Sequence, residues 1–291
     1  MKLTSINEIK SLMARHNMTF SKGYGQNFLI NESVPGRIAA HCGAEKDDGI
    51  LEIGPGIGTL TSELAERYAA VVAVEIDGRL LPILGETLGR YDNVTVIHGD
   101  ILKTPLAEIA EKYFPGREIT VCANLPYYIT SPILMYLLES GVQFRAVTVM
   151  VQKEVARRLI AAPGTPDYGA LTASVNRYGT AERLFDVSSG SFLPAPKVDS
   201  AVVRIVPYRE KPYSVNSERT LGRVIRGGFA QRRKNLANSL SSEFREIKKE
   251  DLIRLLSGLG FGAGVRGEEL GIKEFALVSD AIDGFTNGER T

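Results

Sequence analysis

The chain has 291 residues, of which 44% are hydrophobic and 24% charged, and its formal net charge at pH 7 is +1. These values predict a globular protein with one large and one small domain, and they exclude a membrane-spanning chain, because no apolar run reaches the roughly 18 residues that a span requires. The two cysteines and three histidines form no metal-binding or disulfide pattern, and the N-terminus lacks a secretory signal, so we expect no metal and a cytoplasmic protein.

The first clear pattern along the chain is an N-terminal helix. Ser5 followed by Glu8 resembles a capping box. Apolar residues recur at helical spacing, at Ile6, Ile9, Leu12 and Met13. We expect this helix and the Gly-rich loop after it to form an extension over residues 1–48.

Short apolar runs then alternate with helical patterns. Helices are expected at residues 60–68, 78–88 and 132–140. Strands are expected before, between and after them, at residues 49–53, 71–76, 94–97, 118–123 and 146–151. Strands that alternate with helices favour a parallel sheet covered on both faces, so we expect an α/β domain with a mostly parallel sheet.

The last third of the chain changes character. Two β-rich runs, 183–187 and 198–206, are expected to form a late hairpin. After residue 210 the pattern becomes helical, with helices expected at 217–230, 233–243, 249–257 and 273–283. We therefore expect two domains, an α/β domain over residues 1–208 and a small α-helical domain over residues 209–291.

A Gly-rich loop follows the first strand of the expected sheet. It places Gly54 and Gly56 at the carboxyl end of that strand, where open α/β sheets bind ligands. Glycine lets the backbone approach a ligand closely and permits positive φ. The GxGxG spacing differs from the GxGxxG of dinucleotide-binding enzymes.

Acidic residues stand at the carboxyl ends of the next two strands. Glu75 stands twenty-one positions after Gly54, where a carboxylate can accept the hydroxyl hydrogens of a ribose. Asp100 comes after the third strand, where it can accept a hydrogen bond from an adenine amino group. Either acid alone fits a helix cap or a turn equally well. A Gly-rich loop and two acids at successive strand ends together favour a nucleoside-binding site.

The tetrapeptide Asn124-Leu125-Pro126-Tyr127 follows the fourth strand. The exocyclic amine of adenine is a poor nucleophile because its lone pair is delocalised into the ring. The Asn124 side-chain oxygen and a backbone carbonyl can each accept one hydrogen of this amine, which favours a pyramidal nitrogen. The ring of Pro126 fixes the φ of this residue at about −65°. Tyr127 can stack on an adenine base that has been flipped out of the stack of a nucleic acid. The tetrapeptide indicates catalysis by positioning and electrostatics, although alone it also fits a strand-to-loop turn with a buried tyrosine.

Taken together, these motifs resemble the ribosomal RNA adenine dimethylase family, and most strongly its bacterial small-subunit branch. The motifs stand in family order at residues 25–29, 52–61, 74–77, 99–102, 124–127, 192–204 and 229–236. The resemblance implies a Rossmann-like methyltransferase fold with S-adenosylmethionine as cofactor. It also implies N6,N6-dimethylation of two adjacent adenosines near the 3′ end of small-subunit (16S) ribosomal RNA, within the assembling 30S particle and by a monomer.

The resemblance also assigns roles to residues. The expected cofactor contacts are Asn27, Leu29, Gly54, Glu75, Asp100 and Asn124, with Gly56 in the same loop. The target amine is expected to be held by Asn124, the Leu125 backbone, Pro126 and Tyr127. Phe192 is expected to form a second aromatic wall against the base.

A basic stretch lies in the expected helical domain. Residues 223–238 contain no acidic residue, and from charge alone a solvated helix face explains them. An RNA substrate, however, needs phosphate contacts from a chain that is nearly neutral overall. We therefore expect RNA contacts from Arg223, Arg226, Arg232, Arg233 and Lys234, together with Lys22.

Three alternatives stay open. The related large-subunit adenine dimethylases that confer macrolide resistance share the Gly-rich loop and an Asn-x-Pro-Phe/Tyr motif, although residues 195–204 argue against them. A non-catalytic ribosome-assembly or transcription factor can use the same fold. A nicotinamide oxidoreductase is disfavoured by the GxGxG spacing.

Overall fold

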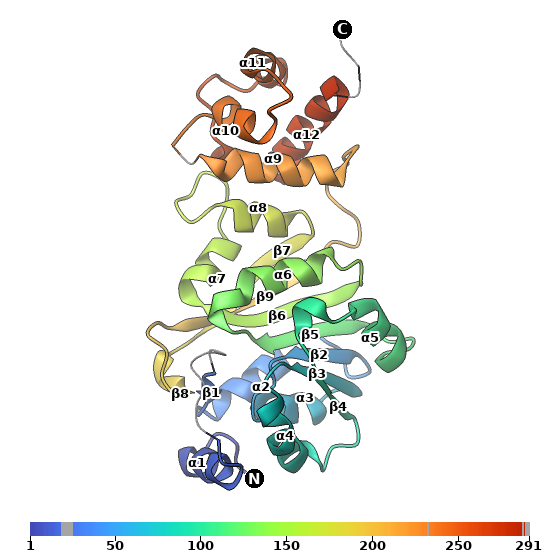
Figure 1. Ribbon diagram of the computed structural model, residues 1–291, viewed down its shortest axis with the longest axis vertical. Helices are drawn as coiled ribbons and strands as arrows, with labels where there is room; N and C mark the ends of the chain where they lie inside the picture. The colour runs from blue at the N-terminus through green and yellow to red at the C-terminus, as the bar shows by residue number, and fades with distance from the viewer. Residues whose placement is uncertain (19–25, 232, 287, 289–291) are drawn as a thin grey trace. The chain divides into compact units, whose positions relative to one another are not determined.

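The computed structural model describes residues 1–18, 26–231, 233–286 and 288 (Figure 1). Two of the expected RNA-binding residues, Lys22 and Arg232, lie outside this range. The chain forms two compact units, Met1–Ala156 with Ala181–Pro207 and Arg157–Thr180 with Tyr208–Thr291. The second unit therefore includes residues 157–180, which the sequence patterns assigned to the first domain. The reason is packing, since Tyr168 is buried among the C-terminal helices and donates a hydrogen bond to the Leu270 carbonyl at 2.7 Å.

The first unit is built on a sheet that has seven strands within the described residues, in the order β4-β3-β2-β5-β6-β9-β7. Strands β2 to β6 are parallel to their neighbours, whereas β9 runs antiparallel to β6. The predicted mostly parallel sheet is confirmed, and β7 and β9 are neighbours as the predicted hairpin requires. The bounds are β2 (Gly49–Ile53), β3 (Ala70–Glu75), β4 (Val94–His98), β5 (Ile119–Asn124), β6 (Phe144–Gln152), β7 (Gly179–Val187) and β9 (Ser200–Pro207).

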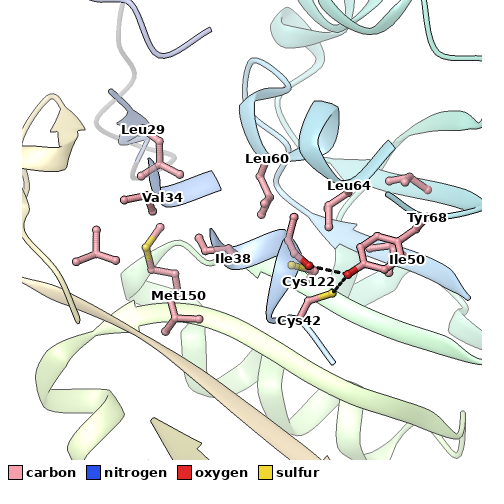
Figure 2. Packing of buried hydrophobic residues seen from close by; sticks show 14 of the residues in the cluster. Leu29, Val34, Ile38, Cys42, Ile50, Leu60, Leu64, Tyr68, Cys122 and Met150 are labelled. Carbon is pink, nitrogen blue, oxygen red and sulfur yellow. Dashed lines mark hydrogen bonds between the residues drawn. The ribbon is translucent and has the colours of Figure 1, made fainter. Parts of the chain in front are cut away.

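Helices of the first unit pack on this sheet through apolar side chains. Helices α2 (Ser33–Ala40) and α3 (Thr59–Ala65) bury Ile38 and Leu64 in one core cluster with Ile50 of β2, Cys122 of β5 and Met150 of β6 (Figure 2). Strands covered in this way read as continuous apolar runs, which is why β2, β3 and β5 were predictable. The other helices of this unit are α4 (Leu81–Leu88), α5 (Leu106–Tyr113) and α6 (Thr130–Glu139), while α7 (Lys153–Leu159) extends into the second unit.

The N-terminal segment departs from its prediction in detail. Helix α1 (Ile6–Arg15) begins after Ser5, as predicted, but the Ser5 side chain makes no capping hydrogen bond, so the expected capping box does not form. The helix is held instead by burial of its apolar face against α4. Farther along, β1 (Phe28–Leu29) pairs with β8 (Phe192–Leu193), with Leu29 opposite Phe192, a non-local pairing that no sequence pattern indicated.

The second unit is helical. Its apolar core is formed by α8 (Ala170–Asn176), α9 (Glu218–Ala230), α10 (Leu236–Glu243), α11 (Lys249–Gly258) and α12 (Ile272–Thr286). Helix α9 begins at the N-cap residue Ser217, whose hydroxyl accepts a hydrogen bond from the Thr220 N–H at 3.1 Å. In the described part of the chain, no helix combines the length and apolar character needed to cross a membrane.

Candidate active site

A pocket lies at the carboxyl ends of the central strands of the first unit. The chain passes from β2 outward to β3 and β4 and then returns to β5, on the other side of β2. Ligands of open α/β sheets bind where the strand order reverses in this way. The pocket brings together the following expected site residues: Asn27, Leu29, Gly54, Gly56, Glu75, Asp100, Asn124, Leu125, Pro126 and Tyr127.

The Gly-rich loop needs glycine for two different reasons. Gly54 has φ +68°, and a Cβ built on it would meet no atom within 4 Å. Its positive φ favours glycine, and the space beside it is open where Gly54 lines the pocket. Gly58 has φ +89° at the start of α3, and a Cβ there would approach Leu88 to 2.9 Å. Gly58 thus permits close helix packing, and Gly54 leaves space for a ligand.

Glu75 ends β3 and ties this strand to the loop. Its Oε2 accepts a hydrogen bond from the Gly56 N–H at 3.2 Å, and its Oε1 accepts one from the Asp77 N–H at 2.8 Å. A carboxylate has about four lone-pair sites on its two oxygens, so Glu75 keeps acceptor capacity for a ligand. Burial raises the pKa of Glu75, and hydrogen bonds from the backbone N–H groups of Asp77, Gly56 and Ile76 oppose this shift.

Asp100 caps a short turn and also lies at the pocket. Its Oδ1 accepts a hydrogen bond from the Leu102 N–H at 3.0 Å and so caps the short turn Ile101–Lys103. Its Oδ2 lies 3.9 Å from the Lys103 Nζ. The residue also lines the pocket. Capping therefore orients the Asp100 carboxylate at the pocket wall.

Glu52 is a pocket residue to which the sequence patterns gave no role. Its side chain is only 1% exposed, it lines the pocket from β2, and its Oε2 has no hydrogen-bond partner among the described residues. Burial raises the pKa of Glu52 to about 8; the nearby Thr61 hydroxyl opposes this shift, and the Glu75 carboxyl adds to it. An acid within an otherwise apolar strand was the signal that could have drawn attention to it.

Asn124 and Leu125 are held from two sides. The Asn124 Nδ2 donates to the Asn27 carbonyl at 3.4 Å, an orientation that reserves the side-chain oxygen for an incoming donor. The Leu125 N–H donates to the Met150 carbonyl on β6 at 3.2 Å. No described hydrogen bond uses the Leu125 carbonyl. Pro126 has φ −59°, as its ring requires. Two acceptors are therefore available at the end of β5.

Of the aromatic residues near this site, Tyr127 and Tyr128 line the pocket, whereas Phe192 does not. The Tyr127 hydroxyl lies 2.6 Å from the Ser200 Oγ on β9, and burial raises the pKa of this tyrosine. Phe192 is 2% exposed, belongs to the apolar core, and is absent from the pocket lining. Its expected contact with a base is therefore not available in this arrangement. Tyr128, which the sequence patterns passed over, lines the pocket and is 60% exposed.

The basic stretch of the second unit divides into paired and exposed residues. Arg223 lies 2.9 Å from a Glu246 carboxylate oxygen and 3.3 Å from one of Glu243, and its guanidinium stacks on the Phe244 ring at 4.2 Å. Arg226 is 65% exposed, with Glu243 at 3.7 Å. Arg233 and Lys234 are exposed. Residues 223–238 contain no acidic residue, but Glu243 of α10 and Glu246 after it neutralise part of their positive charge in the folded protein.

Comparison with known proteins gives consistent matches. A model of the family described as ribosomal RNA adenine dimethylase matches residues 17–257. Ribosomal RNA small subunit methyltransferase A of Geobacillus thermodenitrificans is 47% identical over 94% of each chain. A dimethyladenosine transferase from Plasmodium falciparum has a similar structure, with a TM-score of 0.73 and 25% identity over 89% of this chain and 98% of that one. The 23S rRNA methyltransferase ErmE has a TM-score of 0.66 and 28% identity, over 88% of this chain and 100% of its own.

These likenesses confirm the predicted methyltransferase fold, with its mostly parallel sheet and C-terminal helices. They also agree with the motifs, because the matched range contains the Gly-rich loop, both acidic strand ends and the tetrapeptide after β5. The chain therefore belongs to the ribosomal RNA adenine dimethylase family.

Proposed function

We propose that this protein transfers methyl groups from S-adenosylmethionine to the N6 amines of two adjacent adenosines near the 3′ end of small-subunit ribosomal RNA. The observation that carries the proposal is that one pocket is lined by two acids at the ends of neighbouring strands, Glu75 and Asp100, and by two hydrogen-bond acceptors at the end of β5. We further propose that the enzyme acts in the cytoplasm, as a monomer, on the assembling small subunit.

The residues present fit the cofactor. The open space at Gly54 admits a ligand against the loop backbone. The Glu75 carboxylate retains acceptor capacity for ribose hydroxyls, and Asp100 stands at the adjacent strand end for an adenine amino group. When bound, S-adenosylmethionine would supply an electrophilic methyl group.

The chain's own residues position the amine. The Asn124 oxygen and the Leu125 carbonyl accept its two hydrogens, which turns the nitrogen lone pair away from the adenine ring. The Met150 and Asn27 contacts hold these acceptors in place before substrate arrives, so little reorganisation is needed during the reaction. Positioning is therefore the main contribution of the protein, and no side chain has to act as a general base.

The assignment of the RNA target rests on the relatives. The small-subunit methyltransferase from Geobacillus is 47% identical over nearly the whole chain, whereas ErmE, named for 23S rRNA, is 28% identical. The likeness to ErmE makes a large-subunit target the second candidate. Labelled methyl transfer to undermethylated small subunits and to large-subunit RNA, followed by nucleoside analysis, distinguishes the two. Dimethyladenosine found only in large-subunit RNA would overturn the proposed target.

The role of Asn124 provides a direct test of catalysis. We expect Asn124→Ala to lose methyl transfer by at least about a hundredfold, the scale of removing one positioned transition-state contact. Binding of ribosomal RNA should be largely unchanged, because the substitution removes no basic residue. Filter binding and single-turnover transfer measure the two quantities. Full activity in this variant would refute the assigned role and would favour a non-catalytic assembly factor.

A further inference from the structure

Residues 192–204, one of the runs that resemble the family, contribute to the site in a way that differs from expectation. Neither Phe192 at the start of this run nor Ser200 is among the described residues that line the pocket. Ser200, the first residue of β9, is fully buried, with an exposed fraction of 0%. Its Oγ nevertheless lies 2.6 Å from the hydroxyl oxygen of Tyr127, which does line the pocket. The run therefore reaches the site through a buried serine.

This hydroxyl contact joins two strands that are not neighbours. Tyr127 follows β5, whereas Ser200 belongs to β9, and β6 lies between these strands in the sheet. Neighbouring strands lie about 4.8 Å apart, so β5 and β9 are separated by roughly 10 Å. The Tyr127 side chain therefore extends across the carboxyl end of β6, where Gln152 stands opposite Ser200. The hydrogen bond holds the outer end of the ring.

The backbone end of Tyr127 is held by a second buried hydroxyl. Thr130, at the start of α6, is 2% exposed. Its hydroxyl donates to the Pro126 carbonyl at 3.2 Å and lies 3.5 Å from the Tyr127 carbonyl. These contacts fix the position of the Tyr127 backbone. They leave the two side-chain torsions of the tyrosine free, because neither contact involves the ring.

Ser200 is itself held in place by the residue before it. The Asp199 carbonyl accepts a hydrogen bond from the Lys153 N–H at 3.0 Å, and the Asp199 carboxylate accepts one from the Ser189 N–H at 2.9 Å. The serine therefore offers a fixed anchor to a ring whose torsions are otherwise free. A side chain that is held in its working orientation before substrate binds needs little reorganisation during the reaction.

We propose that Ser200 is a positioning residue for methyl transfer, and that it holds the Tyr127 ring at the angle at which the ring meets the target adenine. Ser200 does not touch the base and acts through the tyrosine hydroxyl. The inference rests on the proposed function, because that function supplies the adenine. It gives residues 192–204 a part in the reaction although Phe192 lies in the apolar core.

A double-mutant cycle tests whether the serine acts through the tyrosine. Ser200→Ala and Tyr127→Phe each remove one hydroxyl of the pair, and the ring is kept in both. We expect each variant to lower the single-turnover rate of methyl transfer, at saturating RNA and S-adenosylmethionine, by about tenfold. The double variant should also lose about tenfold rather than about a hundredfold, because either change alone already breaks the contact. RNA affinity should change by less than about twofold, since phosphate contacts supply most of it.

Thr148→Val is the matched control for the loss of a buried hydrogen bond. Thr148 lies on β6, is 0% exposed, and its hydroxyl donates to the Cys42 carbonyl at 2.7 Å. We expect this variant to lower the melting temperature, as Ser200→Ala does, and to keep the wild-type rate. The rates are compared well below the lowest melting temperature, so that a loss of rate reports positioning and not unfolding. Both variants should bind S-adenosylhomocysteine, the product formed from the cofactor, with wild-type affinity.

The outcomes separate this inference from the proposed function. A wild-type rate in Ser200→Ala, or a double variant whose loss is the product of the single losses, overturns the role of Ser200 and leaves the proposed function intact. If Ser200→Ala does not fold, Tyr127→Phe decides. A wild-type rate in that variant overturns the role, because the ring is then positioned without the hydroxyl pair. No methyl transfer by the wild-type protein to either ribosomal RNA overturns the proposed function instead.

Discussion

Tyr128 offers an exposed aromatic face at the pocket, since 60% of its surface is accessible. Stacking of a base on such a ring contributes about 1–3 kcal/mol. We expect Tyr128→Ala to lower methyl transfer at limiting RNA by about tenfold, and Tyr128→Phe to retain it, because stacking needs only the ring. Initial rates over a range of RNA concentrations measure the effect. The melting temperature should not change in either variant.

Phe192 is the matched comparison for Tyr128, because it is also aromatic but is buried. Phe192→Ala should lower the free energy of unfolding by about 3–5 kcal/mol, the usual cost of deleting a buried ring. A stable Phe192→Ala variant with a specific loss of RNA affinity would restore the expected base wall. It would also show that the segment around β8 rearranges when RNA binds.

The ionisation of Glu52 also predicts how stability depends on pH. Its pKa is raised from 4.5 to about 8 in the folded protein, so the folded state holds a proton that the unfolded state loses above pH 4.5. This contribution is fully present below pH 4.5 and is lost as the pH rises to about 8, by up to about 1.4 kcal/mol per pH unit. Urea unfolding of the ligand-free protein between pH 5 and 8 should show a steeper decline for wild type than for Glu52→Gln. Parallel curves would contradict the buried, protonated state.

At the scale of elements, the strand ends of the α/β unit were predictable, and the pairing of β1 with β8 was not. The runs that became β2, β3 and β5 are mainly apolar; Gly54 follows β2, whereas Glu75 and Asn124 are the last residues of β3 and β5. Chain order alone therefore placed these residues at one edge of the sheet. The pairing of Leu29 with Phe192 joins segments far apart in sequence. This pairing depends on side-chain packing, which the hydrophobic periodicity of the sequence does not indicate. Because of the pairing, Phe192 lies in the apolar core instead of at the pocket.

The packing of the C-terminal helices yields a prediction about two glycines. A Cβ built on Gly267 would overlap the backbone carbonyl of Gly228 in α9, whereas a Cβ on Gly264 would meet nothing within 4 Å. Backbone atoms cannot move aside as a side chain can. Gly267→Ala should therefore destabilise the second unit by about 1–3 kcal/mol. Gly264→Ala should be neutral, or stabilising by up to about 1 kcal/mol.

Thermal unfolding of both variants checks the contrast between these glycines. Equal stabilities would mean that the turn Gly267–Glu269 does not pack against α9 as described. Binding of S-adenosylhomocysteine, measured below the melting temperature, serves as the control, because the pocket residues all belong to the first unit.

For the whole molecule, the distribution of charge matters more than its total. A net charge of +1 gives little general attraction for RNA, so affinity has to come from local groups of cations. The sequence identified such a group at residues 223–238 but could not show which members are already paired. Pairing depends on Glu243 and Glu246, which folding brings beside Arg223. Arg223 therefore contributes to packing and ion pairing within the second unit, while Arg226 and Lys234 remain exposed, and we propose that these two residues contact phosphates.

Because Arg223 is paired and Arg226 and Lys234 are exposed, we expect their substitutions to have different effects. Arg226→Ala combined with Lys234→Ala should weaken RNA binding without lowering the melting temperature. It should also flatten the dependence of log affinity on log salt by about 0.7 for each lost contact with single-stranded phosphate. Arg223→Ala should instead lower the melting temperature, since it removes the contacts of this guanidinium with Glu243, Glu246 and the Phe244 ring. Lys249→Ala, at an exposed position on α11, is the control for general charge loss. If all of these variants bind RNA as wild type does, with the same salt dependence, the RNA-binding surface lies elsewhere on the molecule.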